Sequence, residues 1–217
     1  LKSKFIKYFI KWITSPDNLK IGVEQEKFLF EGKNKKRISY RKLKKLFKNL
    51  KHYKWEPILE KKKIIGLKRK GQKITTEPGL QCELSGEPLE NIHKVCSESS
   101  NYLKEIKESS AGLDINTASI GFDPFNKISE ISKNPKERYR IMNIEMPKDG
   151  KSSLDMMYKT SGIQINYDYT SEKNFEKIFR SANYLVPLTI AIFANSPFKD
   201  LKSSGYMSYR NKVWQET

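Results

Sequence analysis

Residues 20–30 of this chain read Lys20-Ile21-Gly22-Val23-Glu24-Gln25-Glu26-Lys27-Phe28-Leu29-Phe30, a stretch that predicts a β-strand. Side chains two residues apart in a strand share a face, so Glu24 and Glu26 point the same way. Two adjacent carboxylates repel unless a cation lies between them or one carries a proton. The pattern fits a magnesium site or a solvent-facing strand edge. Phe28 and Phe30 share the face of the two glutamates, so this face is not plainly a solvated one.

A second acidic stretch is Glu77-Pro78-Gly79-Leu80-Gln81-Cys82-Glu83-Leu84-Ser85-Gly86. In a strand, Gln81 and Glu83 share one face, and Glu77 lies at the turn before it. If this strand neighbours the first, four carboxylates converge: Glu24, Glu26, Glu77 and Glu83. Such a cluster favours divalent metals and phosphoryl transfer, in which metals offset the charge of the moving phosphate. The alternative is a polar hairpin with no ligand.

Two further polar groups are candidates for a site. Residues 162–169 alternate, which places Gln164, Asn166 and Asp168 on one strand face. That face lines a site or forms the wet side of a half-exposed sheet. Arg210, one of only seven arginines, is a candidate fork for a substrate carboxylate. A surface salt bridge is the alternative for this arginine.

The remaining pattern mixes helices and strands without a βαβ rhythm, which predicts an α+β fold. Short strands are expected between residues 51 and 86, and an extended or loop segment at 112–124. Helices are expected at 5–13, at 39–50, around 138–143, and from an N-cap at Thr170 or Ser171. A long helix is expected after residue 86, with one apolar face made of Leu89, Ile92, Cys96, Ser99, Leu103 and Ile106.

The formal net charge of +17 is concentrated in the first third of the chain. Residues 1–73 carry 24 Lys and Arg against 6 Asp and Glu, whereas residues 74–217 carry 18 against 19. A polyanion-binding surface is one interpretation. The other is a solvated surface of biased composition, which the ratio of 35 Lys to 7 Arg favours because Arg is the usual residue for bidentate recognition. We therefore expect no nucleic-acid partner.

The sequence lacks the motifs of several other kinds of binding site. Cys82 and Cys96 form no CxxC pair, and His52 and His93 are isolated, so a zinc site is not indicated. P-loop and GxGxxG motifs are also absent from the sequence. The apolar stretch 184–194 is too short to span a bilayer, and no membrane association is expected. Two cysteines favour a reducing compartment, so the sequence predicts a cytoplasmic protein.

The motifs resemble the plant and proteobacterial type of glutamate–cysteine ligase, and they follow one another in that family's order. The matching segments are Ile21–Phe28 (IGxExEKF), Thr76–Glu90 (EPGxQxELSGxPLE), Ile92–Cys96 (IHxxC), Arg138–Met142, Met146–Lys148, Leu154–Met157, Gln164–Asn166, Ala194–Phe198 and Ser208–Arg210 with Trp214. The resemblance runs from about residue 5 to the end. It implies that residues 1–217 are the N-terminal part of a single catalytic domain whose C-terminal part is absent here.

The resemblance implies a glutamine-synthetase-like fold, with an antiparallel sheet shaped into a funnel and flanked by helices. It also implies the first step of glutathione synthesis, with ATP and Mg²⁺ as cofactors and L-glutamate and L-cysteine as substrates. The γ-carboxylate of glutamate takes the γ-phosphoryl group of ATP, and the cysteine amine then displaces phosphate. By position, the resemblance implies that Arg210 binds the glutamate carboxylate. It also implies metal ligands at Glu24, Glu26, Glu77 and Glu83, and cofactor-binding residues at Gln81, Gln164 and Asn166.

One departure affects a substrate contact. Lys159 stands where the family commonly has an arginine, so an ammonium replaces a guanidinium fork there. We assign Lys159 with Arg210 to the catalytic residues. Two other functions share this pattern: a related ligase that activates glutamate for a different amine, and a pseudoenzyme that keeps the fold. The intact glutamates count against the second.

Overall fold

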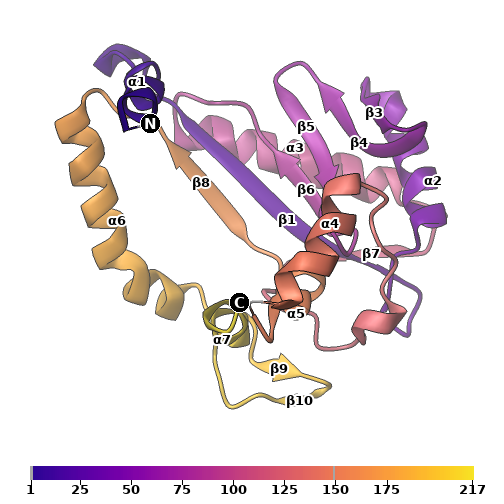
Figure 1. The fold of residues 1–217 in the computed structure, drawn as a ribbon. Coiled ribbons are helices and arrows are strands. Elements are labelled where there is room, and N and C mark those ends of the chain that lie inside the picture. Colours follow the sequence, from indigo (N-terminus) through magenta and orange to yellow (C-terminus); the bar gives the residue numbers. More distant parts are fainter. Residues whose placement is uncertain (1, 149) are drawn as a thin grey trace.

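The computed structural model describes residues 2–148 and 150–217, and these form an antiparallel sheet flanked by helices (Figure 1). The eleven-residue strand β1 (Ile21–Glu31) is the centre of the sheet. The other strands of this sheet are β2 (Lys36–Arg37), β3 (Glu56–Glu60), β4 (Lys63–Arg69), β5 (Gln72–Thr76), β6 (Cys82–Ser85), β7 (Ile115–Ala118) and β8 (Ile163–Tyr167). Strand order is β2-β1-β6-β5-β4-β3, and β7 and β8 also pair with β1. A separate hairpin joins β9 (Phe198–Lys199) to β10 (Lys202–Ser203).

Seven α-helices surround the sheet in the described part of the chain. They are α1 (Lys2–Ile10), α2 (Tyr40–Leu50), α3 (Ile92–Ser109), α4 (Glu137–Glu145), α5 (Ser153–Lys159), α6 (Glu172–Ile192) and α7 (Tyr209–Gln215). Short 3-10 helices lie at Pro16–Asn18, Lys51–Tyr53, Ile128–Glu130 and Met146–Lys148. The predicted α+β class, with an antiparallel sheet and flanking helices, is confirmed.

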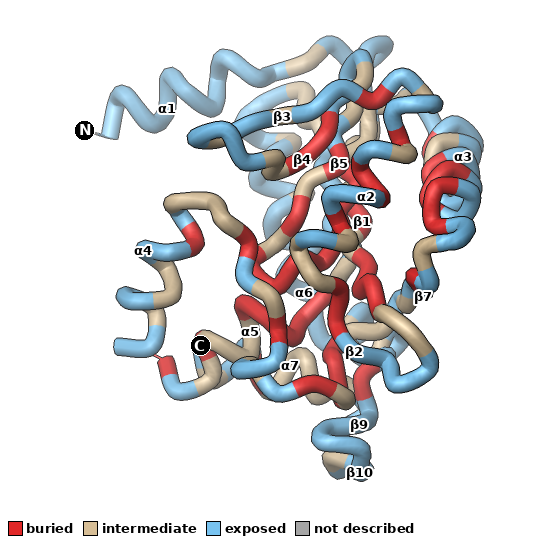
Figure 2. Tube along the Cα trace, turned by 90° about the vertical axis from the view of Figure 1, so that its right-hand side faces the viewer, coloured by how far each residue is buried: buried red, intermediate tan, exposed pale blue. Residues whose placement is uncertain are grey.

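Alternation along β1 divides the sheet into two faces. Leu29 lies on one face, in the main core between the sheet and helices α2 and α3. The same core contains Ile38, Leu43, Leu46, Phe47, Leu50, Trp55, Leu67, Ile74, Leu80, Cys82, Leu84, Tyr102, Ile106 and Ile115. Glu24, Glu26 and Phe28 lie on the opposite face. Figure 2 shows buried residues along β1 and on one side of α3, whereas α1 is exposed.

Helix α2 forms where the sequence predicts it and buries the predicted apolar face. Ser39 caps its N-terminus by accepting a hydrogen bond from the Lys42 N–H at 3.3 Å. The leucines and Phe47, spaced at i, i+3, i+4 and i+7, are the residues that α2 buries.

Helix α3 is present where predicted, but its buried face differs from the predicted one. Val95, Tyr102 and Ile106 are buried, whereas Ile92 and Leu103 are exposed. Two apolar stripes on α3 have helical spacing, and tertiary contacts select between them. The Tyr102 hydroxyl donates to Cys82 Sγ at 3.5 Å inside the core, which turns the Tyr102 side of the helix inward.

Helices α1 and α6 lie at one end of the sheet, near strand β8 (Figure 1). Ser171 caps α6, as predicted, and accepts from the Asn174 N–H at 3.1 Å. Neither α1 nor α6 has a buried residue among those described, and every residue of β8 is exposed. No described helix combines the length and the apolar character needed to cross a membrane.

Candidate active site

The register of β1 against β6 brings two carboxylates together. Glu26 lies directly opposite Glu83 in the antiparallel pair. Opposed residues share a face, with Cβ atoms about 4.5–5.5 Å apart. Like charges at such positions destabilise a sheet. This pairing therefore indicates that a cation or a proton offsets the charge of the two carboxylates.

Glu77 joins the pair from the turn before β6. The Leu80 N–H donates to the Glu77 carbonyl at 2.8 Å, and the Glu77 N–H donates to the Gln81 carbonyl at 2.9 Å. Leu80 itself has a left-handed φ of 62°. One carboxylate oxygen from each of Glu26, Glu77 and Glu83 lies within 4.8 Å of the other two. Three carboxylate oxygens at this spacing match the ligand chemistry of Mg²⁺ or a similar hard cation.

Neutral donors hold all three carboxylates in place. The hydrogen bonds run from the Gly162 N–H to Glu26 Oε2 at 2.7 Å, from the Ser85 hydroxyl to Glu83 Oε1 at 2.7 Å, and from the Tyr139 hydroxyl to Glu77 Oε1 at 3.0 Å. Carboxylates fixed through one oxygen keep lone pairs on the other for a metal.

Two of the carboxyl groups, those of Glu26 and Glu83, have raised pKa values. Burial, followed by the charge of Glu77, raises the pKa of Glu26 from 4.5 to about 7. Burial is also the main cause that raises the pKa of Glu83, with Glu77 contributing. Burial and the neighbouring Glu77 raise the pKa of the Tyr139 phenol, so its hydroxyl remains a donor. A bound divalent cation would reverse these shifts, because it favours the ionised carboxylates.

Arg210 lies on the Glu26 side of the cluster. Its charge and that of Glu26 stabilise each other, while burial lowers the pKa of the guanidinium. Its buried Nε has no hydrogen-bond partner among the described residues. A Cβ added to Gly162 would lie 2.9 Å from Arg210 Nη2, so the guanidinium packs against the Gly162 backbone. This unpaired buried donor fits the predicted role of binding a carboxylate.

Glu24 lies on the same face but outside the close group of three. It is two residues from Glu26 along β1, and its Oε1 accepts from Asn166 Nδ2 at 3.2 Å. Gln164 lies directly opposite Glu24 in β8. Both β8 amides are exposed, on the predicted face. The structure therefore brings together three of the four predicted carboxylates and places Glu24, Gln164 and Asn166 beside them.

Gln81 is buried, and both ends of its side-chain amide are hydrogen-bonded to backbone groups. Its Oε1 accepts from the Gly79 N–H at 2.9 Å. Its Nε2 donates to the carbonyls of Met157 and Thr160 at 3.1 and 2.8 Å. In this structure Gln81 ties the turn before β6 to the end of α5, and cofactor contact by Gln81 stays a prediction.

Lys159, at the end of α5, is 4% exposed. Its ammonium lies 3.7 Å from Asp200 Oδ1 and 4.8 Å from the centre of the Phe122 ring. These contacts, among the described residues, do not include the three carboxylates. Its substrate contact stays a prediction.

Lys136 and Tyr139 also lie at the candidate site, although the spacing of residues in the sequence did not predict them there. Lys136 Nζ donates to the Thr76 carbonyl at 3.0 Å, and Glu77 and Glu83 stabilise its charge while burial lowers its pKa. The segment lies about sixty residues from Glu77 in sequence, so no local pattern links the two. Tyr139 falls inside a motif of the family resemblance, which is the one signal that marks it.

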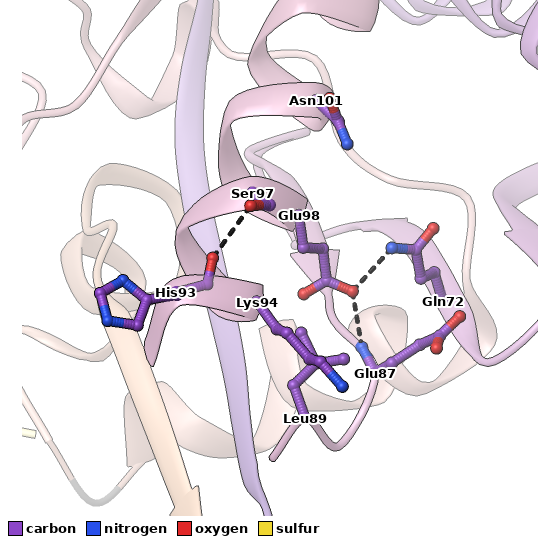
Figure 3. Close-up of a pocket in the computed structure, with 8 residues that line it drawn as sticks. All are labelled: Gln72, Glu87, Leu89, His93, Lys94, Ser97, Glu98 and Asn101. Carbon is purple, nitrogen blue, oxygen red and sulfur yellow. Dashed lines mark hydrogen bonds between the residues drawn. The ribbon is translucent and has the colours of Figure 1, made fainter. Parts of the chain in front are cut away.

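An open cavity lies elsewhere on the molecule. It has a volume of about 380 Å³ and lies along the first turns of α3 (Figure 3). Glu98 accepts from Gln72 Nε2 at 2.6 Å and from the Glu87 N–H at 2.8 Å there. These bonds hold the loop after β6 against α3. The cluster carboxylates do not line this cavity, so convergent chemistry rather than cavity size identifies the candidate site.

Several known proteins are similar in sequence to this chain. The chain is 40% identical over 217 residues to glutamate–cysteine ligase A, chloroplastic, of Oryza sativa subsp. japonica, and covers 44% of that protein. It is 38% identical to the chloroplastic glutamate–cysteine ligases of Medicago truncatula and Arabidopsis thaliana, covering 43% and 42% of them. The chain thus spans less than half the length of these relatives.

The relatives overturn one expectation. Two free cysteines, Cys82 and Cys96, led us to predict a cytoplasmic protein. All three named relatives are chloroplastic, which contradicts that prediction. The number of cysteines indicates whether a compartment is reducing or oxidising, not which compartment it is. A reducing compartment need not be the cytosol.

The family profile of glutamate-cysteine ligase family 2 (GCS2) matches residues 20–217. This match includes β1, β6, β8 and α7, the elements that carry Glu26, Glu83, Asn166 and Arg210. The chain therefore belongs to glutamate-cysteine ligase family 2.

Proposed function

We propose that the complete protein containing this chain joins the γ-carboxylate of glutamate to the amine of cysteine, with ATP and Mg²⁺ as cofactors. This is the first step of glutathione synthesis. The observation that carries the proposal is the convergence of Glu26, Glu77 and Glu83 within 4.8 Å in a member of this ligase family. Arg210 beside Glu26 adds a group suited to an amino-acid carboxylate.

The donor set fits magnesium. Glu26, Glu77 and Glu83 would hold the ion, and Glu24 is the nearest predicted ligand outside the group. Magnesium supplies neutralisation of charge on the phosphoryl oxygens. Without a cation, ATP would meet three carboxylates at close range, which is unfavourable.

Carboxylate activation explains why ATP is needed. An oxygen of the glutamate γ-carboxylate attacks the γ-phosphorus, ADP leaves, and γ-glutamyl phosphate forms. The cysteine amine then attacks the carbonyl carbon and loses a proton, and phosphate leaves with the former carboxylate oxygen. Arg210 would orient glutamate for the first step through its guanidinium. Lys159 would add a second contact to substrate, and Gln81, Gln164 and Asn166 would contact the cofactor.

The test follows ADP release by the complete protein with Mg²⁺, ATP and glutamate, with and without cysteine. We expect glutamate-dependent release that cysteine strongly raises, with γ-glutamylcysteine as the product. Glu83→Gln should lower kcat/KM by roughly 100-fold or more, because a metal ligand is lost. Glu56→Gln is the matched control, because Glu56 is exposed on β3 and pairs with Lys68.

Other outcomes separate the alternatives. Stimulation by an amine other than cysteine would identify a related ligase. A well-folded protein that releases no ADP in response to glutamate would overturn the proposal and indicate a pseudoenzyme.

A further inference from the structure

We propose that Lys136 binds the phosphate groups of ATP, and that the site therefore has two ends. Nucleotide phosphates lie at the Lys136 end and glutamate lies at the Arg210 end. The inference rests on the proposed ligase function.

Lys136 is held beside the carboxylates without being paired to them. Its Nζ donates to the Thr76 carbonyl at 3.0 Å and lies 3.5 Å from the Tyr139 hydroxyl. Its charge interacts with those of Glu77 and Glu83, yet among the described residues it forms no ion pair with either. An ammonium has three donors, so at least one remains available to a ligand.

Neutral donors, and not Lys136, hold the two carboxylates next to it. Glu77 Oε1 accepts from the Tyr139 hydroxyl, and Glu83 Oε1 accepts from the Ser85 hydroxyl. Each of these carboxylates therefore has a neutral donor on one oxygen and keeps its other oxygen for a metal. A compact cation kept free next to metal-binding carboxylates is suited to phosphate oxygens bound to the same metal.

The loop that carries Lys136 is firmly attached to the Glu77 turn. Asn134 Nδ2 donates to the Thr76 carbonyl at 2.6 Å, and the Asn134 N–H donates to the Pro78 carbonyl at 2.9 Å. The Lys136 N–H donates in turn to Asn134 Oδ1 at 3.0 Å. These bonds fix the ammonium relative to the carboxylates, as a preorganised phosphate contact requires.

The two cations act on different ends of the cluster. Arg210 packs against Gly162, whose N–H donates to Glu26. Lys136 Nζ lies 3.5 Å from the Tyr139 hydroxyl, which donates to Glu77. A guanidinium suits a planar carboxylate, and an ammonium suits phosphate as a point charge. This division predicts separate effects on the two substrates.

Calorimetric titration of the complete protein with MgADP, and separately with glutamate, tests the inference. Lys136→Met should weaken MgADP binding by roughly 10-fold or more and leave the glutamate Kd within about 3-fold. Arg210→Met should weaken glutamate binding by roughly 10-fold or more and leave the MgADP Kd within about 3-fold. Lys133→Met is the matched control: Lys133 is exposed on the same loop, and its Nζ reaches Asn143 Oδ1 at 3.5 Å.

Two further variants separate charge from folding. Lys136→Arg keeps the positive charge and should retain more MgADP affinity than Lys136→Met. Tyr139→Phe removes a hydroxyl of the same segment but keeps the ammonium, so it should bind MgADP more tightly than Lys136→Met.

Equal MgADP affinity in Lys136→Met and wild type would overturn the inference, as would a parallel loss of glutamate affinity. It would also be overturned if Lys136→Arg and Tyr139→Phe lost as much MgADP affinity as Lys136→Met. Failure of the wild type to bind either ligand would instead contradict the proposed function.

Discussion

At the residue scale, Glu26 links protonation to stability. Its pKa is raised from 4.5 to about 7, so the metal-free folded protein holds this proton more tightly than the unfolded chain. The stabilising contribution is complete below about pH 4.5 and is lost as the pH rises through 7. In EDTA, we expect unfolding free energy to fall by up to about 3 kcal/mol between pH 5 and 8 from this group.

Glu26→Gln should flatten that pH dependence, because it removes the ionisation, and saturating Mg²⁺ should flatten it in the wild type. Urea unfolding at pH 5, 6, 7 and 8 measures both effects. Equal slopes in wild type and variant would show that Glu26 does not titrate in this range.

Gly162 controls the position of Arg210. An alanine Cβ at Gly162 would lie 2.9 Å from Arg210 Nη2, so the guanidinium must move. We expect Gly162→Ala to raise the KM for glutamate by about 10-fold, since a carboxylate fork depends on geometry. In the control Gly22→Ala, the new Cβ meets Asn166 Cβ at an ordinary 3.5 Å. Unchanged glutamate KM in Gly162→Ala would remove Arg210 from the substrate contacts.

Strand alternation predicted the shared face of Glu24 and Glu26 correctly, and the register with β6 adds Glu83 to it. Alternation does not say which carboxylates approach closely, so the four-residue prediction included Glu24 on equal terms. Lys136 was out of reach of sequence reasoning because its place depends on a loop docking onto a distant turn.

At the scale of elements, the turn between β5 and β6 depends on a close backbone approach. A Cβ on Gly79 would lie 2.7 Å from the Tyr158 carbonyl oxygen, which belongs to α5. Gly79→Ala should therefore cost about 1–3 kcal/mol of stability and displace Glu77. We expect the affinity for Mn²⁺, measured by electron paramagnetic resonance, to fall by about 10-fold.

Gly66→Ala is a matched control for this change. Its Cβ would meet the Ile74 carbonyl oxygen at the same 2.7 Å, but Gly66 lies in β4, away from the carboxylates. It should lose similar stability and keep its Mn²⁺ affinity. If both variants lose affinity equally, general destabilisation rather than the Glu77 turn governs metal binding.

The sequence predicted where helices and strands form more reliably than it predicted which of their faces is buried. Helix α2 has one apolar stripe, so its buried face was predictable. Helix α3 has two, and the choice depends on Tyr102 meeting Cys82 and on Glu105 accepting from Trp55 Nε1 at 2.7 Å. Strand β7 was predicted only as an extended or loop segment, because its pairing with β1 is a long-range contact.

At the scale of the whole molecule, α6 leaves a large apolar surface open. Phe179 is 59% exposed, Val186 on the same helix face is 46% exposed, and the edge strand β8 exposes Ile163 nearby in the chain. Apolar patches of this kind promote association. We expect the 217-residue chain to self-associate in sedimentation velocity, and Phe179→Glu with Val186→Glu to shift it toward monomer.

The melting temperature should change little in that double variant, because neither side chain is buried. Leu59→Glu is the control: Leu59 is 61% exposed on β3, at the other end of the sheet, and should leave association unchanged. A monomeric wild-type chain would contradict the prediction.

We propose that the complete protein activates the γ-carboxylate of glutamate by phosphoryl transfer at the three-carboxylate site. The most direct measurement supplies the complete protein with glutamate carrying ¹⁸O in its γ-carboxylate, together with Mg²⁺, ATP and cysteine. This mechanism places one ¹⁸O in each phosphate released, because the bridging oxygen of γ-glutamyl phosphate leaves with the phosphate. Phosphate without ¹⁸O, formed alongside γ-glutamylcysteine, would contradict it.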